Sequence, residues 1–143
     1  MRKKIIPWVA VTLLLVPLLA GQKRKLGAAS PAQIARGKYL VEKAGLCGDC
    51  HTPTDEKGDP VKEQWLKGAT LGFKPTEPVP GWVDKAPNIA GLPGLEKDAA
   101  IKLLMTGIGS NGLPEHPPMP QYRFNVQDAQ AIVAYLKSLA PNK

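Results

Sequence analysis

The chain has 143 residues, and its length and 43% apolar content fit one globular domain rather than a disordered segment. Two cysteines permit at most one disulfide, which excludes a disulfide-dense scaffold. The net charge is +7, but six of the 19 basic residues lie in the first 30 positions. Residues 31–143 hold 13 basic and 12 acidic side chains. Because so neutral a domain lacks the basic patch that DNA or RNA requires, we expect no nucleic-acid partner.

The N-terminus has the pattern of an export signal, because Arg2-Lys3-Lys4 precedes an apolar run over residues 5–20. The run is slightly short for a transmembrane helix, which needs roughly 17–25 residues. The cleavage signal is imperfect, since Leu18-Leu19-Ala20 lacks a small residue at its first position. We therefore predict that residues 1–30 are an export signal or an N-terminal membrane anchor. Either one carries residues 31–143 across the membrane, and membrane contact would come through residues 5–20.

The first predicted helix covers residues 31–44. Ser30-Pro31-Ala32-Gln33 supplies an N-cap, a proline at the first helical position and the glutamine of a capping box. Gly45 is expected to end the helix. Gly37 in its middle costs about 1 kcal/mol relative to alanine. Its presence is either accidental or allows another helix to approach closely.

Two more helices are predicted in the C-terminal half. One begins at Glu96 and runs to Thr106, where Gly107 closes it. The other begins at Asn125, a good N-cap, and runs to about Leu139 with apolar residues at three- and four-residue steps. About 50 residues with seven prolines separate the first two helices, and no convincing strand is predicted. So long an irregular stretch is uncommon in a compact domain unless it wraps something.

The motif that carries chemistry is Cys47-Gly48-Asp49-Cys50-His51, just after the first helix. Such a Cys-x-x-Cys-His run is typical of covalent haem attachment. Two thiols three positions apart on a helical turn can each add to one vinyl group of the haem, and the next residue projects its imidazole at the iron. A redox Cys-x-x-Cys would need a thioredoxin-like βαβ pattern, which this sequence lacks. A zinc site would need two further ligands, and only His116 is left over.

An iron bound by one histidine needs a sixth ligand or leaves a site open for small molecules. The candidates are Met105, Met119 and His116. Met105 lies on the apolar face of the second helix, where most methionines are simply core residues. Met119 stands in Pro117-Pro118-Met119-Pro120, whose prolines fix the backbone and lower the entropy lost when the sulfur is positioned. This favours Met119, whereas His116 is expected to be a surface side chain or to support a ligand.

At this point the sequence resembles the class I c-type cytochromes, especially mono-haem domains related to the cytochrome subunits of alcohol and gluconate dehydrogenases. The Cys-x-x-Cys-His and Pro-Pro-Met-Pro elements, in that order, are the specific part of the resemblance. The supporting segments are ARGKYLVEKAGLCGDCHTP at 35–53, LKGATLGF at 66–73, APNIAGLPG at 86–94, LLMTGIG with PPMPQYRF at 103–124, and AIVAYLKSLAP at 131–141.

The resemblance implies an all-α class I cytochrome c fold, with three main helices and a long wrapping loop around one covalently bound haem c and its iron. It implies that Cys47 and Cys50 form the thioether bonds, that His51 is the proximal ligand and that Met119 is the distal one. It also implies a helix crossing at Gly37 and Tyr135. Residues 31–143 would form this cytochrome c domain.

The function implied is one-electron transfer and not catalysis, in the periplasm or at the periplasmic face of the inner membrane. The expected partners are redox proteins, namely a dehydrogenase, a cytochrome complex or a terminal oxidase. A rival is a peroxidase-like haem enzyme or gas sensor, in which Met119 dissociates and the iron binds peroxide or nitric oxide. A second rival is a haem-free Cys-x-x-Cys module.

Two departures from the family pattern stand out. Relatives place a proline about a dozen residues after the haem histidine, and its carbonyl orients the imidazole, but this chain has Glu63-Gln64-Trp65 there. The partner of His51 is therefore unassigned. The dehydrogenase subunits also carry several haem motifs, and this chain has one. Three weaker candidates remain for contact with a haem propionate: Trp65, Trp82 and Arg123. For either tryptophan alone, apolar packing against the ring is the favoured interpretation, and the alternative for Arg123 is an exposed side chain.

Overall fold

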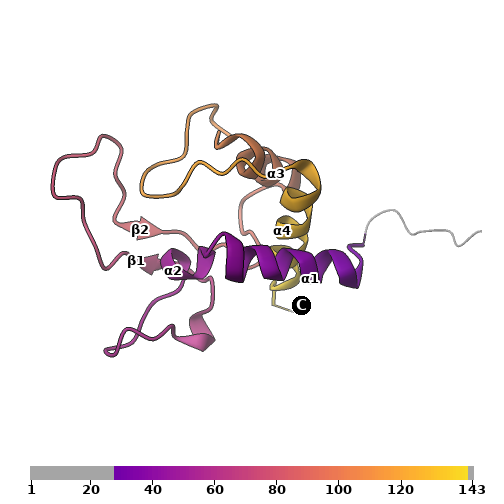
Figure 1. Ribbon diagram of the computed structural model, residues 1–143, viewed down its shortest axis with the longest axis horizontal. Coiled ribbons are helices and arrows are strands. Elements are labelled where there is room, and N and C mark those ends of the chain that lie inside the picture. Colours follow the sequence, from indigo (N-terminus) through magenta and orange to yellow (C-terminus); the bar gives the residue numbers. More distant parts are fainter. Residues whose placement is uncertain (1–27, 142–143) are drawn as a thin grey trace, which may run out of the picture.

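The computed structural model describes residues 28–141, so nearly all of the predicted export signal or anchor lies outside the described residues. Within that range no helix is long and apolar enough to cross a membrane. Figure 1 shows α1 and α4 crossing, with α3 beside them and long loops at one end. The elements are α1 (Pro31–Tyr39), η1 (Leu40–Ala44), α2 (Cys47–His51), η2 (Lys62–Gln64), β1 (Ala69–Thr70), β2 (Lys85–Ala86), α3 (Lys97–Thr106) and α4 (Val126–Ser138).

The first predicted helix is confirmed in extent and changes its hydrogen bonding part-way. The Ser30 hydroxyl accepts a bond from the Gln33 N–H at 3.1 Å, as the capping prediction requires. From Leu40 to Ala44 the chain continues as the π-helical η1, and the Gly45 N–H donates to the Leu40 carbonyl at 2.7 Å. The wider π-type turn therefore carries the helix directly to the segment before the cysteine motif.

The helices α1 and α4 cross (Figure 1). The contact is close because Gly37 lies against Ala131 and Tyr135 of α4. A Cβ at this position would lie 2.5 Å from the Ala131 carbonyl carbon and 2.8 Å from the Tyr135 Cβ. No side chain fits at those distances, so the crossing requires glycine. Around it the buried apolar side chains form one core: Leu40, Val41, Leu66, Leu92, Ala100, Leu104, Ala129, Ala131, Ile132, Val133, Tyr135 and Leu136.

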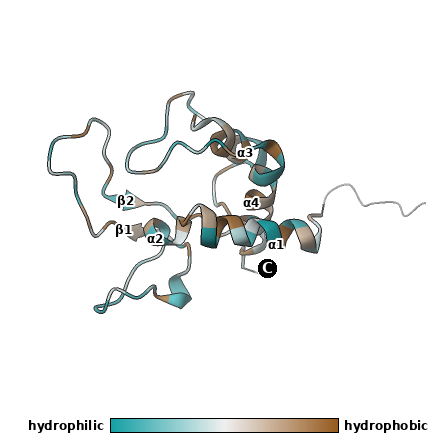
Figure 2. Cartoon of the chain, viewed as in Figure 1, coloured by the Kyte–Doolittle hydropathy of each residue, from teal (hydrophilic) through white to brown (hydrophobic). Residues whose placement is uncertain are grey.

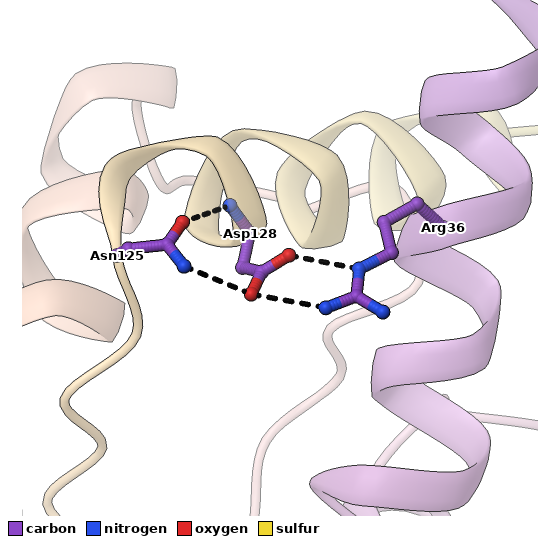
Figure 3. Close-up of polar contacts among 3 residues, drawn as sticks. All are labelled: Arg36, Asn125 and Asp128. Carbon is purple, nitrogen blue, oxygen red and sulfur yellow. Dashed lines mark hydrogen bonds and ion pairs between the residues drawn. The ribbon is translucent and has the colours of Figure 1, made fainter.

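A polar cluster joins the same two helices at the start of α4 (Figure 3). Arg36 donates from Nε and Nη2 to the two carboxylate oxygens of Asp128, at 2.9 and 3.2 Å. Asn125 caps α4 by accepting from the Asp128 N–H at 2.9 Å and also donates to its carboxylate at 3.1 Å. The Arg36 hydrogen bond holds the pKa of Asp128 below its usual range. The predicted N-cap is thus also part of the contact between helices.

The segment between α2 and α3 is mostly irregular, as predicted, but it contains a short antiparallel pair that the sequence did not indicate. Ala69 of β1 pairs with Ala86 of β2, and Thr70 pairs with Lys85. In Figure 2 hydrophobic segments occur in α1, α3 and α4 and at places in the long loops, whereas the loop of residues 53–61 is mostly hydrophilic. Four α-helices are described rather than three, because the cysteine motif itself forms the short α2.

Candidate functional site

The cysteine motif forms one helical turn, as the attachment hypothesis expects. Leu46, with φ of 49°, turns the chain before α2 begins at Cys47. Trp65 covers the turn, since a Cβ at Gly48 would lie 2.6 Å from its ring atom Cζ3. Cys47 and Cys50 are free and half-buried. Both thiols therefore lie on the turn that also carries His51.

His51 is buried, with 7% of its surface exposed, and its ring has a defined orientation. Its Nδ1 lies 2.8 Å from the Pro87 carbonyl oxygen. A carbonyl oxygen can only accept, so Nδ1 carries a proton, and in the neutral ring Nε2 then keeps its lone pair. Burial lowers the pKa of His51, and the bond to Pro87 opposes this in part. The lowered pKa favours the neutral imidazole, the form that binds a metal ion.

Pro87 is the partner of His51 that the sequence left unassigned. It lies 36 residues after the histidine, not about a dozen. Its position depends on a fully buried residue, Leu66, whose N–H donates to the Thr52 hydroxyl at 3.0 Å. The Leu66 carbonyl accepts from the N–H groups of Ile89 at 2.9 Å and Ala90 at 3.1 Å. These bonds, with the β1–β2 pair, tie the residues after Pro87 to the residue after His51.

A cavity of about 620 Å³ lies beside α2 and is lined mostly by apolar side chains. Its walls come from α2, the loop before and after β2, α3, the segment around Met119, and α4. The polar and sulfur-containing side chains in the lining are Cys47, Asp49, Cys50, His51, Lys85, Glu115, His116, Met119 and Tyr122. The predicted site residues therefore meet at one cavity, although 68 positions separate His51 from Met119 in the sequence.

The three candidate distal ligands differ in their relation to this cavity. Met119 and His116 both line it. Met105 does not, and it packs instead against the hydrophobic core. His116 is exposed, and its Nδ1 lies 3.0 Å from the Gly81 carbonyl oxygen. Among residues 28–141, Met119 is therefore the methionine that lines the cavity beside the cysteine motif.

None of the three predicted propionate partners lines the cavity. Trp65 covers Gly48, and the Trp82 indole N–H donates to the Asp84 carboxylate at 3.0 Å. Arg123 donates to the carbonyl oxygens of Gln121 and Tyr122 and to the Gln121 side chain. These polar bonds keep both donors on their own segments. None of the three side chains is therefore part of this cavity wall.

Lys85 and Tyr122 line the cavity and were not identified from the sequence. Lys85 is the one lysine or arginine among the described lining residues. The Tyr122 hydroxyl donates to the Gly45 carbonyl at 2.6 Å, which ties the segment after Met119 to the chain two residues before Cys47. Burial raises the pKa of Tyr122 to about 12. Tyr122 follows Met119 by three positions, and this short spacing could have indicated that it lies near the same site.

The environment of the thiols does not resemble that of a redox-active cysteine. Burial raises the pKa of Cys47 to about 11, and burial followed by the Asp49 charge raises that of Cys50. Reactive cysteines have lowered pKa values. Among residues 28–141 there is also no group of three or more His, Cys, Asp or Glu side chains that could hold a metal ion. Neither the haem-free redox module nor a zinc site is supported by this geometry.

The residues present do fit a covalently bound haem. The cavity offers a mostly apolar wall for the porphyrin, two thiols on one helical turn and a free imidazole Nε2. A neutral thioether lies on the same cavity.

The cytochrome c family model matches residues 34–140. The chain belongs to the cytochrome c family. Members of this family carry covalently bound haem c with its iron, and the spacing of Cys47 and Cys50 fits that attachment. This cytochrome is accordingly an electron-transfer protein and is not itself a catalyst.

Several relatives are subunits of dehydrogenases. The chain is 32% identical over 114 residues to the fructose dehydrogenase cytochrome subunit of Gluconobacter japonicus, covering 73% of this chain and 21% of that protein. It is 28% identical over 120 residues to the cytochrome c subunit of the quinone alcohol dehydrogenase of Gluconobacter oxydans (strain 621H), covering 77% and 24%. For the gluconate 2-dehydrogenase cytochrome c subunit of Pantoea cypripedii the identity is 30% over 120 residues, covering 74% and 26%. The chain thus spans about a quarter of the length of these relatives.

Proposed function

We propose that this cytochrome is a one-electron carrier with His51 and Met119 as the axial ligands of a haem c attached through Cys47 and Cys50. The observation that carries the proposal is the cavity itself. His51, oriented by Pro87, and Met119 line the same mostly apolar space as both thiols. His51 is buried and His116 is exposed, which supports His51 as the histidine ligand.

The bound haem iron supplies the one-electron couple between Fe(II) and Fe(III). The residues of the chain then orient the ligands, favour one oxidation state and exclude water. The Pro87 carbonyl holds the His51 imidazole with Nε2 directed away from the hydrogen bond and raises its basicity as a ligand. The soft, neutral Met119 sulfur favours the reduced state over the oxidised one. Apolar side chains exclude water, so the surroundings rearrange little when the charge changes.

A pair of methionine variants tests the ligand assignment. Met119→Leu removes the sulfur with little change in volume, and Met105→Leu makes the same change on the core side of α3. We expect Met119→Leu to abolish the far-red methionine–iron band of the ferric protein and to permit carbon monoxide binding when reduced. Met105→Leu should retain the band and exclude carbon monoxide. The opposite result would move the distal ligand to Met105, and loss of the band in neither variant would refute methionine ligation.

The proposal extends to location and partners. The relatives named above are cytochrome subunits of dehydrogenases, which supports a dehydrogenase as the electron donor, with a cytochrome complex or terminal oxidase as the acceptor. The basic and apolar pattern of residues 1–20 supports export to the periplasm or its membrane face.

Expression in a Gram-negative host separates the predictions about location. Haem-stained protein should appear in the periplasmic fraction if the signal is cleaved, or in the membrane fraction with intact mass if residues 5–20 anchor it. Recovery from the cytoplasm alone would refute export. For the donor, membranes that contain an alcohol, gluconate or fructose dehydrogenase are mixed with the ferric protein and given the matching substrate. We expect the protein to be reduced with at least one of the three, and reduction with none would contradict a donor of this kind.

A further inference from the structure

The loop that carries Met119 is attached to a second loop, residues 71–84, by two hydrogen bonds. The His116 ring lies with Nδ1 3.0 Å from the Gly81 carbonyl oxygen, and because a carbonyl only accepts, the ring donates. The Val83 N–H donates to the Pro117 carbonyl at 3.0 Å. The Met119 N–H then donates back to the His116 carbonyl at 3.1 Å, which closes a turn. The His116 side chain therefore connects the start of the Pro-Pro-Met-Pro loop to residues 71–84.

The second loop is itself braced, so it can serve as a support. The Leu71 N–H donates to the Asp84 carbonyl at 2.8 Å and closes the base of the loop. Within it, the Phe73 and Trp82 rings meet edge to face with centroids 5.8 Å apart. Gly81 has φ of 75°, and a Cβ there would lie 3.3 Å from His116 Nδ1. The backbone turn at Gly81 thus presents its carbonyl to the histidine at close range.

Met119 is held from both sides, and each side has one side-chain anchor in the described part of the chain. On the C-terminal side the Tyr122 hydroxyl donates to the Gly45 carbonyl at 2.6 Å. On the N-terminal side the anchor is His116. A thioether is a weak, neutral ligand and gives way to an external ligand when its loop can move. The rate of that replacement then depends on the bonds that hold the loop.

We propose that His116 is a positioning residue for Met119. Its hydrogen bond to the Gly81 carbonyl fastens the Pro-Pro-Met-Pro loop to residues 71–84 and slows replacement of the Met119 sulfur by external ligands. The proposal rests on the His51/Met119 ligation proposed above. It gives His116 a role without contact to the iron, although its side chain lines the cavity.

The test uses ferric holoprotein and imidazole as the external ligand. His116→Ala removes the bond, whereas His116→Asn can place an amide N–H near the position of Nδ1. We expect His116→Ala to retain the far-red band and to bind imidazole about tenfold faster and more tightly than the parent, as loss of one hydrogen bond implies. His116→Asn should restore most of the slow binding. Asp128→Asn, which weakens the α1–α4 contact away from this loop, controls for a general loss of stability and should bind imidazole as the parent does.

The outcomes separate this proposal from the one it rests on. Equal imidazole binding by parent and His116→Ala would overturn the positioning role, and so would equally fast binding by Asp128→Asn. If Met119→Leu loses the far-red band, the ligand assignment stands whatever the His116 variants do. If His116→Ala loses the low-spin spectrum and Met119→Leu keeps it, His116 is itself the ligand and both proposals fail.

Discussion

Gly37→Ala tests whether the α1–α4 crossing depends on the missing side chain. Helix propensity alone predicts that alanine would stabilise α1 by about 1 kcal/mol. The structure predicts the opposite, because the new Cβ would lie 2.5 Å from the Ala131 carbonyl carbon, whereas ordinary van der Waals contact begins at 3.4 Å. The clash is with backbone, so the helices must separate by about 1 Å or more. Overpacking of this kind costs roughly 1–3 kcal/mol, and here the upper end applies because a helix has to move.

Subtracting the propensity gain leaves a net loss of about 2 kcal/mol in the free energy of unfolding. With a urea slope near 2 kcal/mol/M, the midpoint should fall by about 1 M. The assay is urea unfolding of the holoprotein followed by far-UV circular dichroism. Gly72→Ala is the matched control, because a Cβ there meets nothing within 4 Å. A Gly37→Ala protein as stable as the parent, or more stable, would refute the steric argument.

Three further predictions concern the cofactor site and the helix contact. Cys47→Ala removes one thioether bond and should lower the haem-loaded yield several-fold, measured as haem stain per protein on a denaturing gel. Lys85→Gln should lower the midpoint potential relative to Lys85→Arg, because a nearby positive charge favours the reduced state, and a potentiometric titration measures this. Arg36 lowers the folded-state pKa of Asp128, so their pair stabilises the fold above the unfolded pKa of about 3.9 and is lost as pH falls through the folded value. The stability difference between parent and Asp128→Asn should therefore shrink from pH 7 to pH 3.

Each of these has a contradicting result. Full haem loading of Cys47→Ala would deny that residue a role in attachment. Equal potentials for Lys85→Gln and Lys85→Arg would mean that the lysine charge does not reach the iron. A stability difference that persists unchanged at pH 3 would show that Asp128 acts through something other than its charge.

The helices could be predicted because their signals are local. The caps at Ser30 and Asn125 each bond to an N–H three residues away. Gly107 ends α3 in the left-handed conformation that glycine tolerates best. The change to π-type bonding at η1 was not predicted, since its apolar pattern is compatible with an ordinary helix. The extent of this helix was right, and only its hydrogen bonding differed.

The site was predictable in part for the same reason. The cysteines and His51 form one contiguous motif, and the prolines around Met119 mark a constrained segment. Pro87 could not be assigned as the partner of His51, because its position depends on the bonds at Leu66 and on the β1–β2 pair. Neither feature leaves a periodic pattern in the sequence. It does lie in APNIAGLPG, one of the segments that supported the resemblance. Lys85 was missed because a lone lysine before such a segment is indistinguishable from a solvated one.

Because of the bond between Pro87 and His51, attachment of the cofactor and orientation of the His51 imidazole depend on different parts of the chain. In the proposed site, covalent retention of the cofactor would depend on the contiguous Cys-x-x-Cys-His motif, whereas the orientation and basicity of the imidazole depend on a carbonyl 36 residues away. Changes at Leu66 or in the β1–β2 pair can thus shift that carbonyl and the redox potential while the thioether bonds stay intact. Related chains could diverge in potential through this loop and still carry identical haem-binding motifs.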